Sequence, residues 1–144
     1  MWIIFALGAS IVWGITYVLG EQIYKKISVI TALSITTLLS GVVMFIVAYA
    51  AGFLKKDIST VFASKGLLAL VLSEAACLMI AELFIGFSIT GKNATLAGLI
   101  EISYPLFIAL FAYLLFRENQ INLATMVGGI VIFTGVFIIY YFNS

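Results

Sequence analysis

The sequence contains no histidine, one cysteine and one proline. Histidine is the commonest metal ligand and acid–base group of proteins, so its absence argues against both kinds of chemistry. The single thiol, Cys77, cannot form a disulfide within the chain. The pair Gly128-Gly129 has no lysine beside it and therefore does not fit a phosphate-binding loop. We expect no catalytic residues, no metal site and no cofactor, and hence no enzyme.

Charge is also scarce. Only 9% of the 144 residues are charged, 65% are hydrophobic and the net charge is +1. A soluble domain carries roughly a quarter charged residues, so a surface this apolar requires lipid as its solvent. A net charge near zero provides no basic field for nucleic acid. The expected partner is the lipid bilayer, and we expect no binding of nucleic acid.

Five long apolar runs are separated by short polar breaks. A helix needs about 20 apolar residues to cross the hydrocarbon core of a membrane, and each run reaches that length. The runs cover residues 2–22, 29–53, 66–90, 94–116 and 121–142. The sequence predicts an all-α integral membrane bundle of five transmembrane helices, forming one domain over residues 1–144. Tyr49 and Phe53 end the second run, as expected of an aromatic belt at the membrane interface.

An odd number of spans places the two termini on opposite faces of the membrane. The face of the N-terminus carries four cations: Lys55, Lys56, Lys65 and Arg117. The other face carries three: Lys25, Lys26 and Lys92. Because cytoplasmic loops are enriched in Lys and Arg, this excess favours a cytoplasmic N-terminus in a multi-pass protein of the cell membrane. A difference of one charge leaves insertion in both orientations open.

Three carboxylates lie well inside the apolar runs, away from the run ends and with no cation at matching depth: Glu74, Glu82 and Glu101. Ionisable groups within a membrane span are expensive and usually functional. Glu82 and Glu101 lie about ten and nine residues from the Lys92 turn, which places both roughly 14 Å along their helices. Apolar surroundings favour the neutral form of a carboxyl group, so these acids suit proton coupling. The alternative is that they stay protonated and only hydrogen-bond neighbouring helices.

Two further features surround these acids. Pro105 cannot donate to the carbonyl of Glu101 four residues earlier, which predicts a kink one turn from the acid. The first helix aligns Trp13, Tyr17 and Glu21 at spacings of four, a face too polar for lipid. The candidate substrate-binding residues are Trp13, Tyr17, Glu82, Glu101, Tyr104 and Pro105, and the candidate proton-coupling residues are Glu74, Glu82 and Glu101.

Small residues form stripes on the last two predicted helices, which predict helix–helix seams. The stripe of the fourth run consists of Ala94, Ala97, Gly98, Pro105, Ala109 and Ala112. That of the fifth run consists of Thr125, Gly128, Gly129, Ile132 and Gly135.

Several short motifs resemble those of a known family. They are Trp13-Gly14 in the first helix, Tyr104-Pro105-Leu106-Phe107, Phe116-Arg117-Glu118, and the pairs Gly128-Gly129 and Thr134-Gly135 in the last helix. Together they resemble an EamA domain of the drug/metabolite transporter superfamily, and more distantly the small multidrug-resistance transporters. The family usually has leucine-glycine where this chain has Phe116-Arg117.

The resemblance implies a carrier that exports small metabolites or drugs, often by proton or substrate exchange. Typical members contain two such domains in inverted orientation, and this sequence has one. A single repeat does not enclose a midplane site by itself, so we expect a dimer, either an antiparallel homodimer or a heterodimer with a similar half. The rival hypothesis is a membrane accessory or assembly subunit whose acids are structural. A channel lacks support, because the sequence has no ring of like charges and no filter-like loop.

Overall fold

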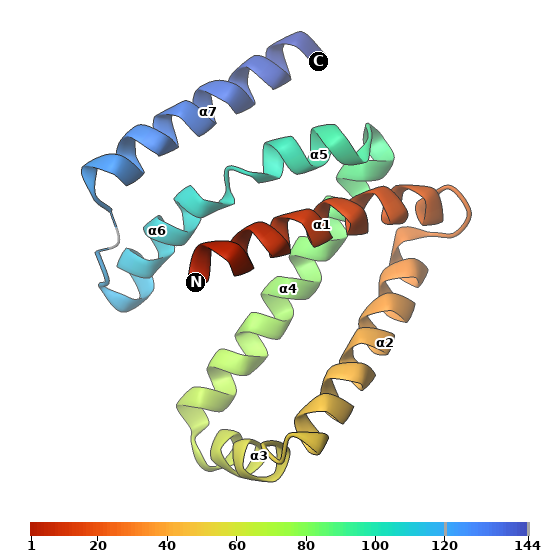
Figure 1. Cartoon of the computed structure of the whole chain (residues 1–144), viewed down its shortest axis with the longest axis vertical. Helices are drawn as coiled ribbons and strands as arrows, with labels where there is room; N and C mark the ends of the chain where they lie inside the picture. The colour runs from red at the N-terminus through yellow and green to blue at the C-terminus, as the bar shows by residue number, and fades with distance from the viewer. Residues whose placement is uncertain (120, 144) are drawn as a thin grey trace. The chain divides into compact units, whose positions relative to one another are not determined.

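The computed structural model describes residues 1–119 and 121–143, and these fold into helices joined by short turns (Figure 1). The helices are α1 (Trp2–Tyr24), α2 (Val29–Ala50), α3 (Leu54–Ala63), α4 (Lys65–Gly91), α5 (Ala94–Glu101), α6 (Tyr104–Phe116) and α7 (Leu123–Asn143). No strand occurs within the described ranges. The all-α class predicted from the sequence is confirmed.

Among the residues that the structure describes, five segments are long and apolar enough to cross a membrane: α1, α2, α4, the combined stretch Ala94–Phe116, and α7. Each of the five predicted runs corresponds to one of them. The last helix begins at Leu123, two residues later than predicted, and residue 120 of the preceding polar break lies outside the described residues. The chain is an integral membrane bundle of five transmembrane segments, one of which is divided.

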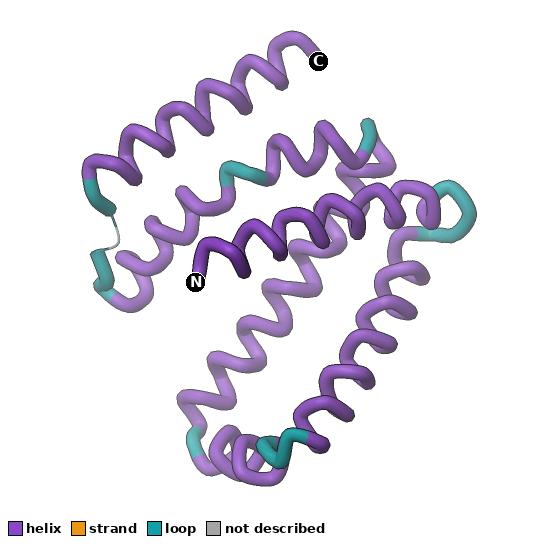
Figure 2. The backbone as a smooth tube through the Cα atoms, in the orientation of Figure 1, coloured by secondary structure: helices purple, strands orange, loops and turns teal. Residues whose placement is uncertain are grey.

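The divided segment is the fourth. It consists of α5 and α6, and a short non-helical stretch separates them (Figure 2). The predicted kink near Pro105 is observed as a two-residue break at Ile102 and Ser103, whose backbone angles stay in the right-handed region. Pro105 lies in the first turn of α6, where proline is tolerated because the N–H groups there have no partner within the helix.

Helix α3 was not predicted, because its polar residues suggest only a loop between two spans. Its ten residues follow α2 after a tight turn and end one residue before α4. The turn is made by Gly52, whose φ of 78° is left-handed, and by a bond from the Phe53 amide to the Ala48 carbonyl. This six-to-one bond is typical of a helix end closed by glycine.

Helix α6 ends in a similar way but without glycine. Arg117 adopts a left-handed φ of 60°, and the Glu118 amide donates to the Ala112 carbonyl at 3.2 Å. Arg117 thus occupies the left-handed position that glycine adopts with the least strain. Its guanidinium also lies 5.7 Å from the centre of the Tyr113 ring.

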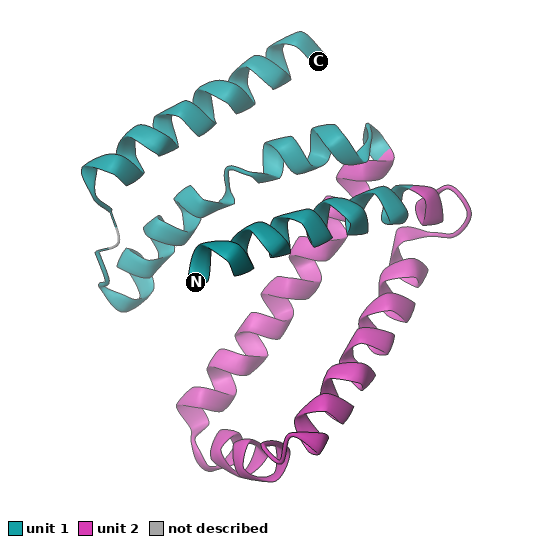
Figure 3. Cartoon of the chain, in the orientation of Figure 1, with its two compact units in different colours: residues 1–21, 91–144 teal, residues 22–90 magenta. Residues whose placement is uncertain are grey.

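The chain divides into two compact units (Figure 3). Unit 1 comprises residues 1–21 and 91–144, and so contains most of α1 together with α5, α6 and α7. Its interior consists of small residues: Ala94, Ala97, Ala109 and Gly129 are buried. A Cβ atom on Gly129 would lie 2.4 Å from a methyl carbon of Leu106, so α6 and α7 are in close contact there. No neighbouring atom lies within 4 Å of such a Cβ on Gly128 or Gly135.

Unit 2 comprises residues 22–90, with the last turn of α1 and all of α2, α3 and α4. Its buried residues are Val29, Ala32, Gly86 and Ile89. The start of α2 contacts the end of α4 at Gly86, where a Cβ atom would lie 2.5 Å from Val29 Cγ1. Both units use glycine and alanine to bring helices together, as membrane helices generally do.

Candidate functional site

In unit 1, Glu101 is paired with a tyrosine. The hydroxyl of Tyr17 donates a hydrogen bond to Oε2 of Glu101, and both side chains are half-buried. The Tyr17 ring lies against α5 at Gly98, where a Cβ atom would be 3.3 Å from Tyr17 Cδ2. The missing side chain of Gly98 therefore lets the tyrosine cross α5 and reach an acid three residues further along.

A second contact joins α1 to the other end of α5. Oε2 of Glu21 accepts a hydrogen bond from the Ala94 amide at 2.8 Å. The Asn93 side chain caps the same helix by accepting from the Leu96 amide at 2.8 Å. Acidic and Asn side chains suit a helix N-terminus, where backbone N–H groups lack partners. Helix α5 is only eight residues long, and α1 holds it at both ends.

Glu101 is the last residue of α5, directly before the interruption. The Ser103 amide donates to the Ile100 carbonyl at 3.2 Å, and the Ser103 hydroxyl donates to the same carbonyl at 3.0 Å. Pro105 has no N–H to offer the Glu101 carbonyl. The acid therefore lies where regular helical hydrogen bonding stops, and such discontinuities often form the binding sites of transporters.

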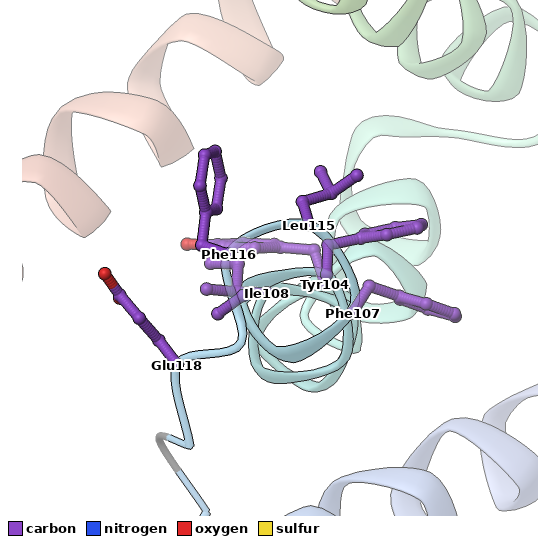
Figure 4. A pocket seen from close by; sticks show the side chains of 8 residues that line it. Tyr104, Phe107, Ile108, Leu115, Phe116 and Glu118 are labelled. Atoms are coloured by element: carbon purple, nitrogen blue, oxygen red, sulfur yellow. The ribbon is translucent and has the colours of Figure 1, made fainter.

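The other substrate-site candidates of unit 1 lie near these elements. The ring centres of Trp13 and Tyr17 are 5.7 Å apart and the rings are tilted by 57°. Trp13 is 47% exposed, so about half of its surface is not covered by the described chain. Tyr104 lines an open groove of about 690 Å³ along α6, with Phe107, Phe111 and Glu118 among its lining residues (Figure 4). Pro105 is exposed and does not line this groove.

Unit 2 holds the other two predicted acids. Glu82 is half-buried within α4 and interacts electrostatically with Tyr24 at the end of α1. A Cβ atom on Gly86, one turn further along α4, would lie 3.6 Å from the Tyr24 hydroxyl. Glu74 lies near the middle of α4 and is exposed. Because Glu82 and Glu101 belong to different units, their common depth stays a prediction.

Metal binding is not indicated in the described part of the chain, where no three acidic, cysteine or histidine side chains cluster. The candidate site of unit 1 thus consists of the Tyr17–Glu101 pair, the neighbouring Trp13 and the break between α5 and α6, and unit 2 separately holds Glu82 with Tyr24.

The comparisons with known proteins agree with the motifs. The family model described as the EamA-like transporter family matches residues 1–141. The chain belongs to the EamA-like transporter family. It is thus a multi-pass membrane transporter of the drug/metabolite type. We found no match among curated proteins and none among solved structures.

The structure brings together two of the residues that the sequence predicts for the site, and it adds neighbours that the sequence does not predict. Tyr17 and Glu101 were both proposed as substrate residues, although their mutual hydrogen bond was not foreseen. Tyr24 was assigned to a polar break, and its spacing of seven residues from Tyr17, two helical turns, was the available signal. The capping role of Glu21 had no sequence signal, because it depends on which helix end lies beside α1.

Proposed function

We propose that the chain is a half-size secondary transporter that exports a small metabolite or drug-like solute by proton- or exchange-coupled alternating access. The observation that carries this proposal is the hydrogen bond between Tyr17 and Glu101 at the interruption of the fourth span. It places an ionisable group, its hydrogen-bond donor and a break in one helix at a single point of an EamA-like chain.

In this mechanism Glu101 exchanges a proton for the solute. When the carboxylate is charged, the Tyr17 hydroxyl stabilises it by donating a hydrogen bond, and such charge-assisted bonds are strong. When Glu101 gains a proton, that bond weakens and α5 is held less tightly at this end. The non-helical residues between α5 and α6 absorb the resulting change in backbone angles, as hinge residues do.

The remaining candidates have supporting roles in the proposal. Trp13, Tyr17, Tyr104 and Pro105 form the wall of the substrate path, and Glu82 is a second coupling acid with Tyr24 as its neighbour. Glu74 is a third coupling candidate and also an argument for a partner. A carboxylate exposed in the middle of a span is costly in lipid, so this face of α4 is expected to meet protein.

The partner in this proposal is a second half. Inverted-repeat transporters place their site between two related halves, and the EamA-like match here covers one repeat of five segments. An antiparallel homodimer or a heterodimer with a similar chain supplies the missing half. In the cell membrane, the N-terminus is proposed to face the cytoplasm in a fixed-orientation chain, and to face both sides in a dual-topology homodimer.

The coupling role is tested with purified protein in proteoliposomes under an imposed pH gradient. Ethidium serves as a lipophilic-cation probe, and an amino-acid mixture serves as a metabolite probe. The wild type is expected to move at least one probe class against its gradient with opposite proton flux. Glu101→Gln should abolish this movement, whereas Asp57→Asn, at an exposed acid on α3 outside the site, should retain it.

The rival function, an accessory subunit with structural acids, has one supporting observation: Glu21 already serves as a helix cap. It predicts the opposite pattern of results. If Glu101→Gln lowers thermal stability in detergent while probe transport stays at the wild-type rate across pH, the acid is structural and the proposed coupling is wrong. Wild-type liposomes that move neither probe also contradict the transporter as proposed.

The partner is tested with reporter fusions at each terminus. Both termini found on both sides of the membrane support the antiparallel homodimer. One fixed orientation supports the heterodimer, and transport by proteoliposomes that each contain a single chain contradicts both.

A further inference from the structure

We infer that α3 is an interfacial helix that lies on the membrane surface and binds anionic phospholipid headgroups through its lysines. Helix α3 joins two membrane-spanning helices, α2 and α4, within unit 2. The proposed transport mechanism does not use it, so the two proposals stand independently.

The first observation is the distribution of side chains around α3. Its large apolar residues are Leu54, Ile58, Val61 and Phe62. With 3.6 residues per turn, these four occupy an arc of about 100°. The rest of the circumference carries Lys55, Lys56, Asp57, Ser59 and Thr60, together with Ala63. An apolar stripe opposite a polar, lysine-bearing face is typical of helices that lie in the membrane interface.

The second observation is that the rest of the chain covers only part of the apolar arc, since Leu54 and Val61 are half-buried but Ile58 and Phe62 are exposed. Phe62 is 72% exposed and Ile58 is 41% exposed. Burying such side chains removes apolar surface from water. In a chain that is embedded in a bilayer, the nearest apolar medium is the lipid that already surrounds α2 and α4.

The third observation fixes the depth of α3. Tyr49 and Phe53 close the end of α2 and are 74% and 64% exposed, and aromatic side chains of this kind sit at the headgroup level. Helix α3 begins at the residue after Phe53 and is separated from α4 by Ser64 alone. Because short connections join its two ends to the transmembrane helices α2 and α4, α3 lies within the interfacial layer.

The charge of α3 and its flanking residue favours anionic over neutral lipid headgroups. Lys55 and Lys56 are exposed on α3, and Lys65 follows at the start of α4. Against these three cations stands Asp57, in the first turn of the helix, so the segment carries a net charge of +2. Such juxtamembrane lysines are attracted to anionic phospholipids, by about fivefold in binding per lysine. Lysine stems also extend along apolar surface while their ammonium groups reach the headgroups.

The position of α3 is tested by nitroxide labels on the full chain in nanodiscs, in a Cys77→Ala background. Labels at Phe62→Cys and Ile58→Cys should collide more with oxygen, which partitions into lipid. A label at Ser59→Cys, on the polar face, should collide more with a water-soluble nickel chelate. If position 62 is as accessible to nickel as position 59, α3 is solvated and the inference is wrong.

The same labels separate lipid from the other occupant of an apolar face, a second copy of the chain. Spin–spin broadening at position 62 that disappears on dilution with unlabelled chains would show that a second copy covers the arc, and would overturn the proposal. No broadening, together with oxygen accessibility, supports lipid.

Headgroup selection is measured with a fluorophore on Phe62→Cys, quenched by nitroxide-bearing phosphatidylglycerol or phosphatidylcholine. Phosphatidylglycerol should quench more strongly, and the preference should fall several-fold in the double variant Lys55→Gln, Lys56→Gln. The matched control is Lys25→Gln, Lys26→Gln in the turn between α1 and α2, which should keep the preference. Equal quenching by the two lipids in the parent protein would show that α3 does not select anionic headgroups.

Discussion

Each compact unit brings a tyrosine, a glutamate and a glycine close together, but the helix that carries the glutamate differs between the units. In unit 1, Tyr17 bonds Glu101 over Gly98 on the eight-residue helix α5. In unit 2, Tyr24 lies near Glu82 and beside Gly86 on the 27-residue helix α4. Each acid thus has a tyrosine from α1 and a glycine within about one turn.

The units differ in the backbone beyond the acid. Helix α5 stops at Glu101, whereas α4 continues from Glu82 to Gly91. In the proposed mechanism, protonation of Glu101 is accompanied by movement of the short helix α5, whereas the long continuous helix α4 resists such movement at Glu82. The two carboxylates thus have similar neighbours but lie on different backbones. Three sets of substitutions test the contrast.

The largest effect on transport is expected from a substitution that makes the broken fourth span of unit 1 continuous, as α4 is in unit 2. Pro105→Ala restores an N–H for the Glu101 carbonyl, and proline is about 3 kcal/mol less favourable than alanine within a helix. We expect α5 and α6 to join, backbone hydrogen exchange over residues 101–105 to slow, and probe transport to fall. Pro105→Gly restores the same N–H without rigidity and should keep more transport. An alanine variant that exchanges and transports like the wild type would show that the break is not a hinge.

The glycines beside the two acids should respond differently. Gly86→Ala places Cβ 2.5 Å from Val29 Cγ1, a β-branched side chain with little freedom to move. Overpacking should destabilise the protein by about 1–3 kcal/mol, seen as a lower melting temperature in detergent. Gly98→Ala meets Tyr17 at 3.3 Å, so it should displace the tyrosine and reduce transport with less loss of stability.

Gly128→Ala is the control for both glycine variants, because no neighbouring atom lies within 4 Å of its Cβ position. It should leave stability and transport unchanged or slightly improved. Equal stability losses in Gly86→Ala and Gly98→Ala would contradict the different packing of the two units.

The smallest effect concerns the two left-handed helix ends. Arg117 in unit 1 and Gly52 in unit 2 have φ of 60° and 78°. Gly52→Ala should cost about 1 kcal/mol, because a Cβ is strained in this conformation. Arg117→Gly should gain about 0.5 kcal/mol, since relief of strain exceeds the loss of the exposed cation–π contact with Tyr113. Thermal unfolding in detergent measures both, and a destabilised Arg117→Gly would show that the contact outweighs the strain.

The membrane class, the five spans and their approximate ends follow from the amino-acid sequence alone. The physical reason is that lipid demands long apolar helices and pushes charges into the breaks. The sequence also predicted a helix kink at Pro105, next to Glu101, because proline lacks the N–H that would donate to the Glu101 carbonyl. The family motifs lie along the chain and needed no contacts to be recognised.

Which side chains contact one another depends on how the helices pack. The bond from Tyr17 to Glu101 and the cap of Glu21 on Ala94 join residues 84 and 73 positions apart, and no local pattern specifies such pairs. The sequence likewise did not show that α3 is helical, because a ten-residue segment with three charges resembles a loop until its ends are seen. Packing at Gly98 then fixed Tyr17 against α5, since only a residue without a side chain leaves room for the ring.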